Sequence, residues 1–211
     1  MRVLLAGFGP FPGAPSNPSA TLVKALARRR RPALTALVCR THVFATTYAA
    51  VDRDMPRLFA DKPDVVLLIG LAGRRLHLCL ETRARNATSM IFPDASGHHP
   101  SSPVIESGWP GVLIGRAPFV PLLAALHAAG VPARLSRDAG RYLCNYAYWR
   151  ALRQTHNGRP LVQFLHIPAI ARDAQPRSRR RDRSSRCPPS LRQLIIAIEC
   201  VLIALAAASR R

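Results

Sequence analysis

The sequence is poor in lysine, in acidic residues and in paired cysteines. Lys24 and Lys62 are its only lysines, and 11 acidic side chains stand against 31 basic ones in 211 residues, a formal net charge of +20. Such an excess of positive charge is typical of proteins that bind nucleic acid. The arginines are spread over expected turns and helix faces, whereas nucleic-acid binders concentrate basic and aromatic side chains on one face. We therefore favour an interpretation without a nucleic-acid partner.

The five cysteines are an odd number, and none of them forms a Cys-x-x-Cys pair. Disulfide frameworks and structural zinc sites need paired cysteines, so the sequence predicts neither of them, and we expect no metal and no other cofactor. Unpaired cysteines fit a reducing compartment. Met1 leads straight into a strand-like run, which is not typical of a signal peptide. We therefore expect a cytoplasmic protein.

Short apolar runs alternate with helical segments along the chain. The expected strands are residues 2–6, 34–44, 64–70, 132–135 and 161–167, with 76–86 extended, and the expected helices are 19–31, 48–59 (interrupted at Met55-Pro56), 118–129 and about 142–152. Strands that alternate with helices favour an α/β protein with a mostly parallel sheet covered on both faces.

The length of 211 residues suits a single domain. We expect an α/β core over residues 1–171, a mobile Arg-, Pro- and Ser-rich connection over 172–190, and a hydrophobic C-terminal helix of the same domain over 191–211. The alternative for this helix is a membrane anchor, because its apolar run is nearly as long as a bilayer span. Arg192 and Glu199 interrupt that run, and a charge in mid-span costs about 2.5–3.5 kcal/mol. We favour the packed helix and expect no membrane partner.

The first candidate for a catalytic group is Cys144. It follows a turn at Gly140 and opens a run with an apolar face at helical spacing. A thiol at the N-terminus of a helix lies near the positive end of the helix dipole, which favours the thiolate that a nucleophilic cysteine needs. Free cysteines are also among the most buried residue types, so the alternative for Cys144 on its own is a packing residue.

Glu81 and His166 complete a candidate hydrolytic set with Cys144. A cysteine hydrolase needs a thiolate as nucleophile, an imidazole that transfers protons and a carboxylate that orients the imidazole. The alternatives are a structural histidine at position 166 and a surface ion pair between Glu81 and Arg83 or Arg85.

Several of these groups lie at the ends of expected strands. They are Gly7–Phe11, Gly70, Ser136–Cys144 and His166. Ligands of open α/β sheets bind at the carboxyl ends of the strands. We therefore expect these segments to converge at one edge of the sheet.

Four motifs stand out along the chain. They are Gly7-Phe8-Gly9-Pro10-Phe11 with Asn17-Pro18-Ser19, Gly70 to Arg74 continuing through Glu81 to Asn86, Ser136 to Asn145, and Phe164 to Pro168 with Gln175 beyond it. In this order and at these separations they resemble the motifs of the type I pyroglutamyl peptidases, also called pyrrolidone-carboxylate peptidases. The resemblance covers most of the chain, and four ordered motifs are far more specific than one.

The resemblance implies a single-domain, three-layer α/β/α sandwich with a mostly parallel central sheet. It implies a cytoplasmic cysteine exopeptidase that removes N-terminal 5-oxoproline (pyroglutamate) from peptides. In such an enzyme Cys144 is the nucleophile, His166 is the general base and then the general acid, and Glu81 orients His166. Many members are homotetramers, so the resemblance also implies a homo-oligomer.

The lactam of 5-oxoproline is uncharged and needs an apolar slot with a few polar groups. By resemblance, Phe8 and Phe11 line this slot, with Tyr142 and Leu143 close by. Leu71 stands where the family commonly has glutamine, so recognition of the lactam at this position depends on whether the side chain or the backbone makes the contact.

Two further residues depart from the family pattern, Thr82 and Arg83, which follow the candidate glutamate. The alternative function is therefore a family member with altered specificity, or one that binds an anionic partner without cleaving it.

Overall fold

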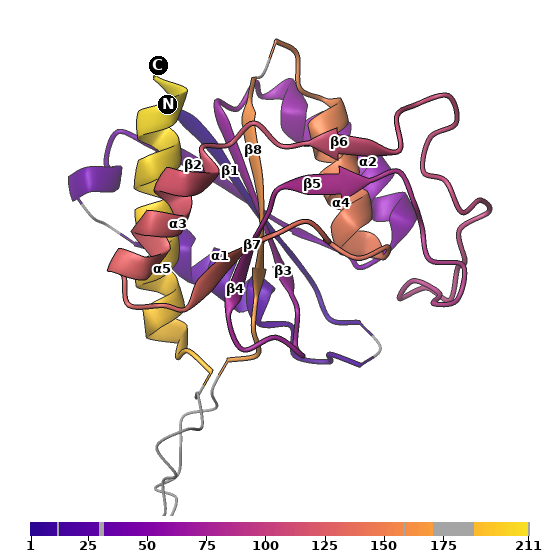
Figure 1. The fold of residues 1–211 in the computed structure, drawn as a ribbon, viewed down its shortest axis with the longest axis horizontal. Helices are drawn as coiled ribbons and strands as arrows, with labels where there is room; N and C mark the ends of the chain where they lie inside the picture. Colours follow the sequence, from indigo (N-terminus) through magenta and orange to yellow (C-terminus); the bar gives the residue numbers. More distant parts are fainter. Residues whose placement is uncertain (12, 30–31, 158, 171–187, 211) are drawn as a thin grey trace, which may run out of the picture.

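The computed structural model describes residues 1–11, 13–29, 32–157, 159–170 and 188–210. The elements are, in chain order, β1 (Arg2–Phe8), α1 (Pro18–Ala27), the 3-10 helix η1 (Pro32–Leu34), β2 (Val38–Phe44), α2 (Tyr48–Ala60), β3 (Val65–Leu71), β4 (Leu78–Glu81), β5 (Arg83–Arg85), β6 (Val112–Ile114), α3 (Phe119–Ala128), β7 (Ala133–Ser136), α4 (Leu143–Arg153), β8 (Leu161–Ile167) and α5 (Leu191–Ser209). Within these described residues, six strands form one sheet in the order β2-β1-β3-β8-β4-β7, and β5 and β6 form a separate antiparallel pair (Figure 1).

The large sheet is mostly parallel, as the sequence predicts. Strands β2, β1, β3 and β8 run in one direction, whereas β4 runs antiparallel to β8 and parallel to β7. Glu81 at the end of β4 therefore pairs with Phe164, and Ser136 at the end of β7 pairs with Glu81. The prediction that Ser136 shares a strand-end edge with His166 is wrong, because β7 points the opposite way from β8. Residues 137–142 lead the chain from this point to α4.

Helices cover both faces of the sheet. One face packs against α1, α3 and α5, and the other packs against α2 and α4 (Figure 1). Successive side chains of a strand point to opposite faces, so each central strand serves both layers. In β3, Leu67 and Ile69 belong to the cluster under α5, and Val66 and Leu68 belong to the cluster under α4. The predicted three-layer α/β/α sandwich is confirmed.

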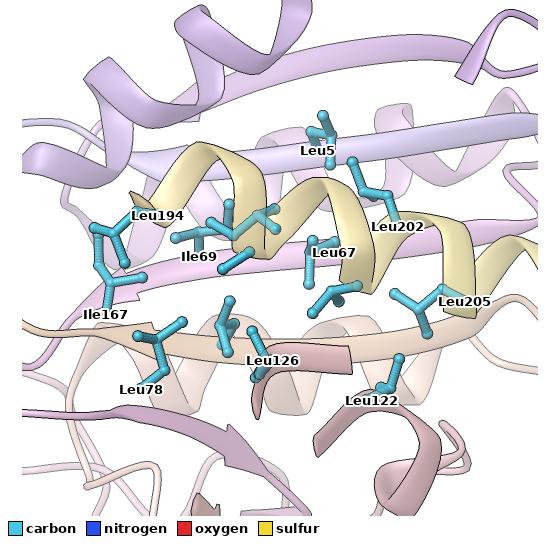
Figure 2. Close-up of a cluster of buried hydrophobic side chains, with 14 of the residues drawn as sticks. Leu5, Leu67, Ile69, Leu78, Leu122, Leu126, Ile167, Leu194, Leu202 and Leu205 are labelled. Atoms are coloured by element: carbon cyan, nitrogen blue, oxygen red, sulfur yellow. The ribbon is translucent and has the colours of Figure 1, made fainter. Parts of the chain in front are cut away.

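Helix α5 packs lengthwise on its face of the sheet. Figure 2 shows Leu194, Leu202 and Leu205 of α5 in the same buried cluster as Leu67 and Ile69 of β3. By length and composition α5 could also cross a membrane: an 18-residue stretch of it has a mean hydropathy of 2.1, and 44% of that stretch is buried inside the molecule. The core helix of a soluble protein has the same length and composition, so these two features alone are weak evidence for a membrane span. The absence of a membrane partner stays a prediction.

Some local predictions need correction. β2 begins at Val38, later than predicted, because η1 occupies residues 32–34. Pro56 lies inside α2 without ending it, since Met55 and Leu58 on either side are buried and hold the helix in place. The extended run predicted over 76–86 divides into β4 and β5. β6 is only 3 residues long and has no clear signal in the sequence.

The predicted connection over 172–190 lies largely outside the described residues. The division into a core, a connection and a C-terminal helix therefore stays a prediction. What the structure does describe is that α5 shares one hydrophobic cluster with the strands of the core.

Candidate active site

A buried histidine and a buried glutamate form the inner part of the site. His166 comes from β8 and Glu81 from β4, the strand beside it in the sheet. The two side chains are joined by a hydrogen bond of 2.8 Å between His166 Nδ1 and Glu81 Oε1. His166 is 5% exposed and Glu81 is 0% exposed. This bond assigns the Nδ1 proton to the side of Glu81 and leaves Nε2 for another partner.

Cys144 lies beside this ring: the two side chains line the same cavity and interact with each other. Cys144 is the second residue of α4, which begins at Leu143. Its sulfur packs against the backbone of Gly70 in β3, where an added Cβ would lie 2.8 Å from Cys144 Sγ. The thiol therefore lies between the first turn of α4 and β3, at the position where Gly70 leaves β3 without a side chain.

The protonation states of His166 and Glu81 depend on each other and on their neighbours. Burial lowers the pKa of His166, but its hydrogen bonds with Cys144 and Glu81, and the charges of these two groups, raise the pKa to about 9. Burial raises the pKa of Glu81, but the hydrogen bond from His166 and the charges of His166 and Arg75 hold it below its usual range. At neutral pH, Glu81 is therefore ionised and His166 is protonated. An imidazolium beside a thiol favours the thiolate.

A cavity of about 200 Å³ opens beside Cys144 and His166. It is lined by every residue that the resemblance assigns to the substrate, namely Phe8, Phe11, Leu71, Tyr142 and Leu143. Residues from three different parts of the sequence thus meet in one cavity. Its lining is mainly apolar and aromatic, as a slot for a small uncharged ring requires.

Asn17, Thr46 and Ala139 also line this cavity. The sequence identifies Asn17 as a helix cap, and its Oδ1 does accept the Ser19 N–H at 3.1 Å. Its Nδ2 also donates to the Gly9 carbonyl at 3.0 Å, and Thr46 Oγ1 donates to the same carbonyl at 3.0 Å. Sequence reasoning missed Thr46, since it belongs to no pattern that points to chemistry, and it did not single out Ala139 within the Ser136 to Asn145 motif.

The ion-pair partner of Glu81 was also missed. The structure pairs Glu81 with Arg75, at 3.0 Å between Nη1 and Oε1. Arg83 instead donates to the carbonyl of Arg137, and Arg85 pairs with Asp138. The alternative of a surface pair with Arg83 or Arg85 is therefore wrong. A position six residues before a glutamate, across a turn, gives no periodic signal that could have identified Arg75.

The start of α4 provides backbone donors next to the thiol. The first backbone hydrogen bond of this helix runs from Tyr146 N–H to Tyr142 O, at 3.0 Å. The N–H groups of residues 143–145 lie in the first turn, where a helix supplies no acceptors of its own. The Tyr142 hydroxyl donates to the carbonyl of Pro93, at 2.9 Å.

Comparisons with known proteins identify the family of this chain. The family model described as pyroglutamyl peptidase matches residues 1–211. A pyrrolidone-carboxylate peptidase of Vibrio vulnificus (strain YJ016) is 31% identical over 203 residues, which are 96% of this chain and 91% of that protein. A pyrrolidone-carboxylate peptidase of Gloeobacter violaceus is 34% identical over 176 residues, or 82% of this chain and 84% of that protein.

Solved structures show the same fold. The pyrrolidone carboxyl peptidase from Thermococcus litoralis has a TM-score of 0.82 at 27% identity and covers 99% of this chain and 95% of its own. A mutant pyrrolidone carboxyl peptidase from Pyrococcus furiosus has a TM-score of 0.84 at 24% identity, with coverage of 99% and 100%. The chain therefore belongs to the pyroglutamyl peptidase family and is a cysteine peptidase that removes N-terminal pyroglutamate from peptides.

Proposed function

We propose that this chain hydrolyses the bond after N-terminal 5-oxoproline through an acyl-enzyme on Cys144. His166 transfers the protons, and Glu81 orients His166. The observation that carries these assignments is the continuous line of side chains from Cys144 through His166 to Glu81. The Cys144 end of this line opens on an apolar cavity.

Acylation begins at the thiolate of Cys144. It attacks the carbonyl carbon that joins 5-oxoproline to the next residue, and a carbon–sulfur bond forms while the carbonyl electrons move to the oxygen. Backbone N–H groups at the start of α4 stabilise this oxyanion. His166 then gives its proton to the leaving amine, and the carbon–nitrogen bond breaks.

Deacylation uses the neutral form of His166 that the first step leaves behind. The imidazole takes a proton from water, and the water oxygen attacks the thioester carbon. The thiolate of Cys144 leaves, and 5-oxoproline departs as a free acid. Glu81 keeps its bond to Nδ1 through both steps, which fixes the ring and stabilises its charged form.

Specificity for 5-oxoproline follows from the cavity beside the thiol. Phe8 and Phe11 supply apolar surface for the lactam ring, and Leu71 adds to it without any hydrogen-bonding side-chain atom. Apart from the reacting pair Cys144 and His166, the polar side chains on the lining are uncharged: Asn17, Thr46 and Tyr142. A free ammonium group would enter this slot without a carboxylate to pair with, which is costly, whereas the lactam carries no charge.

The test is release of dye from an amide of 5-oxoproline. We expect Cys144→Ala to abolish release and Cys39→Ala, at an exposed cysteine, to leave it unchanged. Cys144 should react with iodoacetamide near neutral pH, and more slowly in His166→Ala. Equal alkylation rates in the wild type and His166→Ala would contradict the thiolate–imidazolium pair, and inactivity on several such amides would overturn the function.

We further propose that the enzyme works in the cytoplasm on peptides with N-terminal pyroglutamate, as a homo-oligomer. The support is the unpaired cysteines and the family resemblance. Light scattering coupled to size-exclusion chromatography measures the oligomeric state, and a monomer at micromolar concentration contradicts this part of the proposal.

A further inference from the structure

A fourth charged group, the partly exposed Arg75, extends the line of Cys144, His166 and Glu81 towards the surface. Arg75 lies in the turn between β3 and β4, and its Nη1 donates to Glu81 Oε1 at 3.0 Å. The same oxygen is bonded to His166 Nδ1 at 2.8 Å. One carboxylate oxygen therefore serves both cations. With the thiolate formed, the charges alternate along the line: negative, positive, negative, positive.

Arg75 also ties together the segments that carry the three catalytic groups. Its Nη2 donates to the carbonyl of Asp138, in the loop that leads to Cys144, at 3.1 Å. Its own N–H donates to Ala72 O at 2.9 Å, and the Ala72 N–H donates to Ile167 O, directly after His166, at 2.8 Å. The rigid planar fork of an arginine suits this role, because it offers several donors in fixed directions.

We propose that Arg75 is a positioning residue that acts through Glu81 and sets the pH range in which Cys144 and His166 work. This inference rests on the proposed function of the same site. A buried carboxylate that faced only His166 would hold the imidazolium proton too strongly for the deacylation step, which needs the neutral ring. The guanidinium shares the carboxylate charge and limits that effect.

The titratable and charged groups around Arg75 and Glu81 come from several strands. Cys79 and Glu81 of β4 face Arg75, and Arg134 of β7 acts on Cys79. His166 and Ser136 act on the Glu81 side chain. Burial lowers the pKa of Arg75, but its hydrogen bonds with Cys79 and Glu81, and their charges, more than offset burial. Arg75 therefore stays charged throughout the range in which the other groups titrate.

The Glu81 backbone is held independently of Arg75. Its carbonyl accepts hydrogen bonds from Tyr148 Oη at 3.0 Å and from Gln163 Nε2 at 3.1 Å. Removal of the guanidinium therefore changes the electrostatic environment and the orientation of the Glu81 carboxylate, while the backbone of β4 keeps its position.

The direction of the effect follows from electrostatics. Loss of a nearby positive charge leaves the full charge of Glu81 to His166, which stabilises the imidazolium and raises its pKa. The alkaline limb of the pH profile of kcat/KM, where His166 loses its proton, should therefore move to higher pH in Arg75→Met. We expect a shift of about one pH unit, the low end for a neighbouring charge, because Arg75 acts through Glu81.

The experiment compares Arg75→Met, Arg75→Lys and the control Arg74→Met on an amide of 5-oxoproline across pH. Arg74 is the exposed neighbour, so its replacement removes the same net charge from the same turn. Arg74→Met should keep the wild-type profile. Arg75→Lys should keep the profile and lose part of kcat, because lysine retains the charge but not the fork. KM should change little, because Arg75 does not line the cavity.

The outcomes separate this inference from the proposed function. A wild-type protein that hydrolyses no such amide overturns the function itself. An active wild type with an unshifted profile in Arg75→Met overturns only the role of Arg75, as does an equal shift in Arg74→Met. If Arg75→Met does not fold, Arg75→Gln removes the same charge and keeps a hydrogen-bond donor, and an unshifted profile in that variant overturns the inference equally.

Discussion

Replacement of Gly70 by alanine tests how closely the protein holds the thiol of Cys144. A Cβ at position 70 would lie 2.8 Å from Cys144 Sγ and 2.8 Å from Phe164 Cζ. Unstrained contacts between carbon atoms lie at about 3.5–4.0 Å, so each of the two contacts must lengthen by about 1 Å. Phe164 is fully buried and packs against Phe8 and Tyr148, whereas Cys144 is only partly buried and lies beside a cavity. The thiol should give way.

The magnitude follows from that displacement. A shift of about 1 Å in a reacting group costs about 100-fold in rate, so kcat/KM of Gly70→Ala should fall by about that factor. Overpacking a core costs about 1–3 kcal/mol, and each kcal/mol lowers Tm by about 2–4 °C in a domain of this size. The variant should therefore fold and melt some degrees below the wild type.

Dye release from an amide of 5-oxoproline measures the loss, and the alkylation rate of Cys144 reports the thiol directly. Gly73→Ala is the matched control, because its Cβ would meet only Leu71 Cγ, at 4.0 Å. If Gly70→Ala folds and keeps the wild-type kcat/KM, the thiol does not depend on the bare backbone of β3, and the reasoning is refuted.

His166 should titrate near pH 9 in an NMR titration of its ring protons, against an ordinary value of 6.5, because Cys144 and Glu81 stabilise its charged form. The stability contributed by that proton is complete below about pH 6.5 and is lost as the pH rises through 9; a ring that titrates near 6.5 contradicts this account. Asn145→Ala should cost about 2–4 kcal/mol in urea unfolding, since the amide bonds to Arg85 N and O, at 2.8 and 2.9 Å, and leaves these groups unpaired when it is removed. Ile198→Ala should cost about 2–5 kcal/mol, and the same change at Ile203, which is 37% exposed, should cost far less; equally small losses would show that α5 does not pack in the core.

The sequence predicts most of the fold because burial leaves strong patterns. Strand β3 is a continuous apolar run, which only a strand covered on both faces requires, and the structure places it in the centre of the sheet. The direction of β4 was not predictable in the same way. A strand of 4 buried residues looks the same from either end, and only its pairing with β8 decides its direction.

The candidate site also has residues that the sequence identifies and residues that only the folded chain shows. Cys144, His166 and Glu81 carry chemistry at family-like separations, so the sequence identifies them. Arg75 does not differ in type from Arg74, and only the folded chain shows which of the two arginines points to Glu81. Thr46 likewise joins the cavity through tertiary packing alone.

The packing of α5 has a consequence for the order of events during synthesis. All the residues of the proposed site, from Phe8 to His166, leave the ribosome before α5 does. The face of the sheet that α5 covers includes Leu5, Leu67 and Ile69, and it stays open to water until residues 191–209 have emerged. A nascent chain at that stage exposes apolar surface to aggregation and to chaperones, although its catalytic groups are already made. The emergence of α5 therefore determines when the newly synthesised enzyme becomes stable.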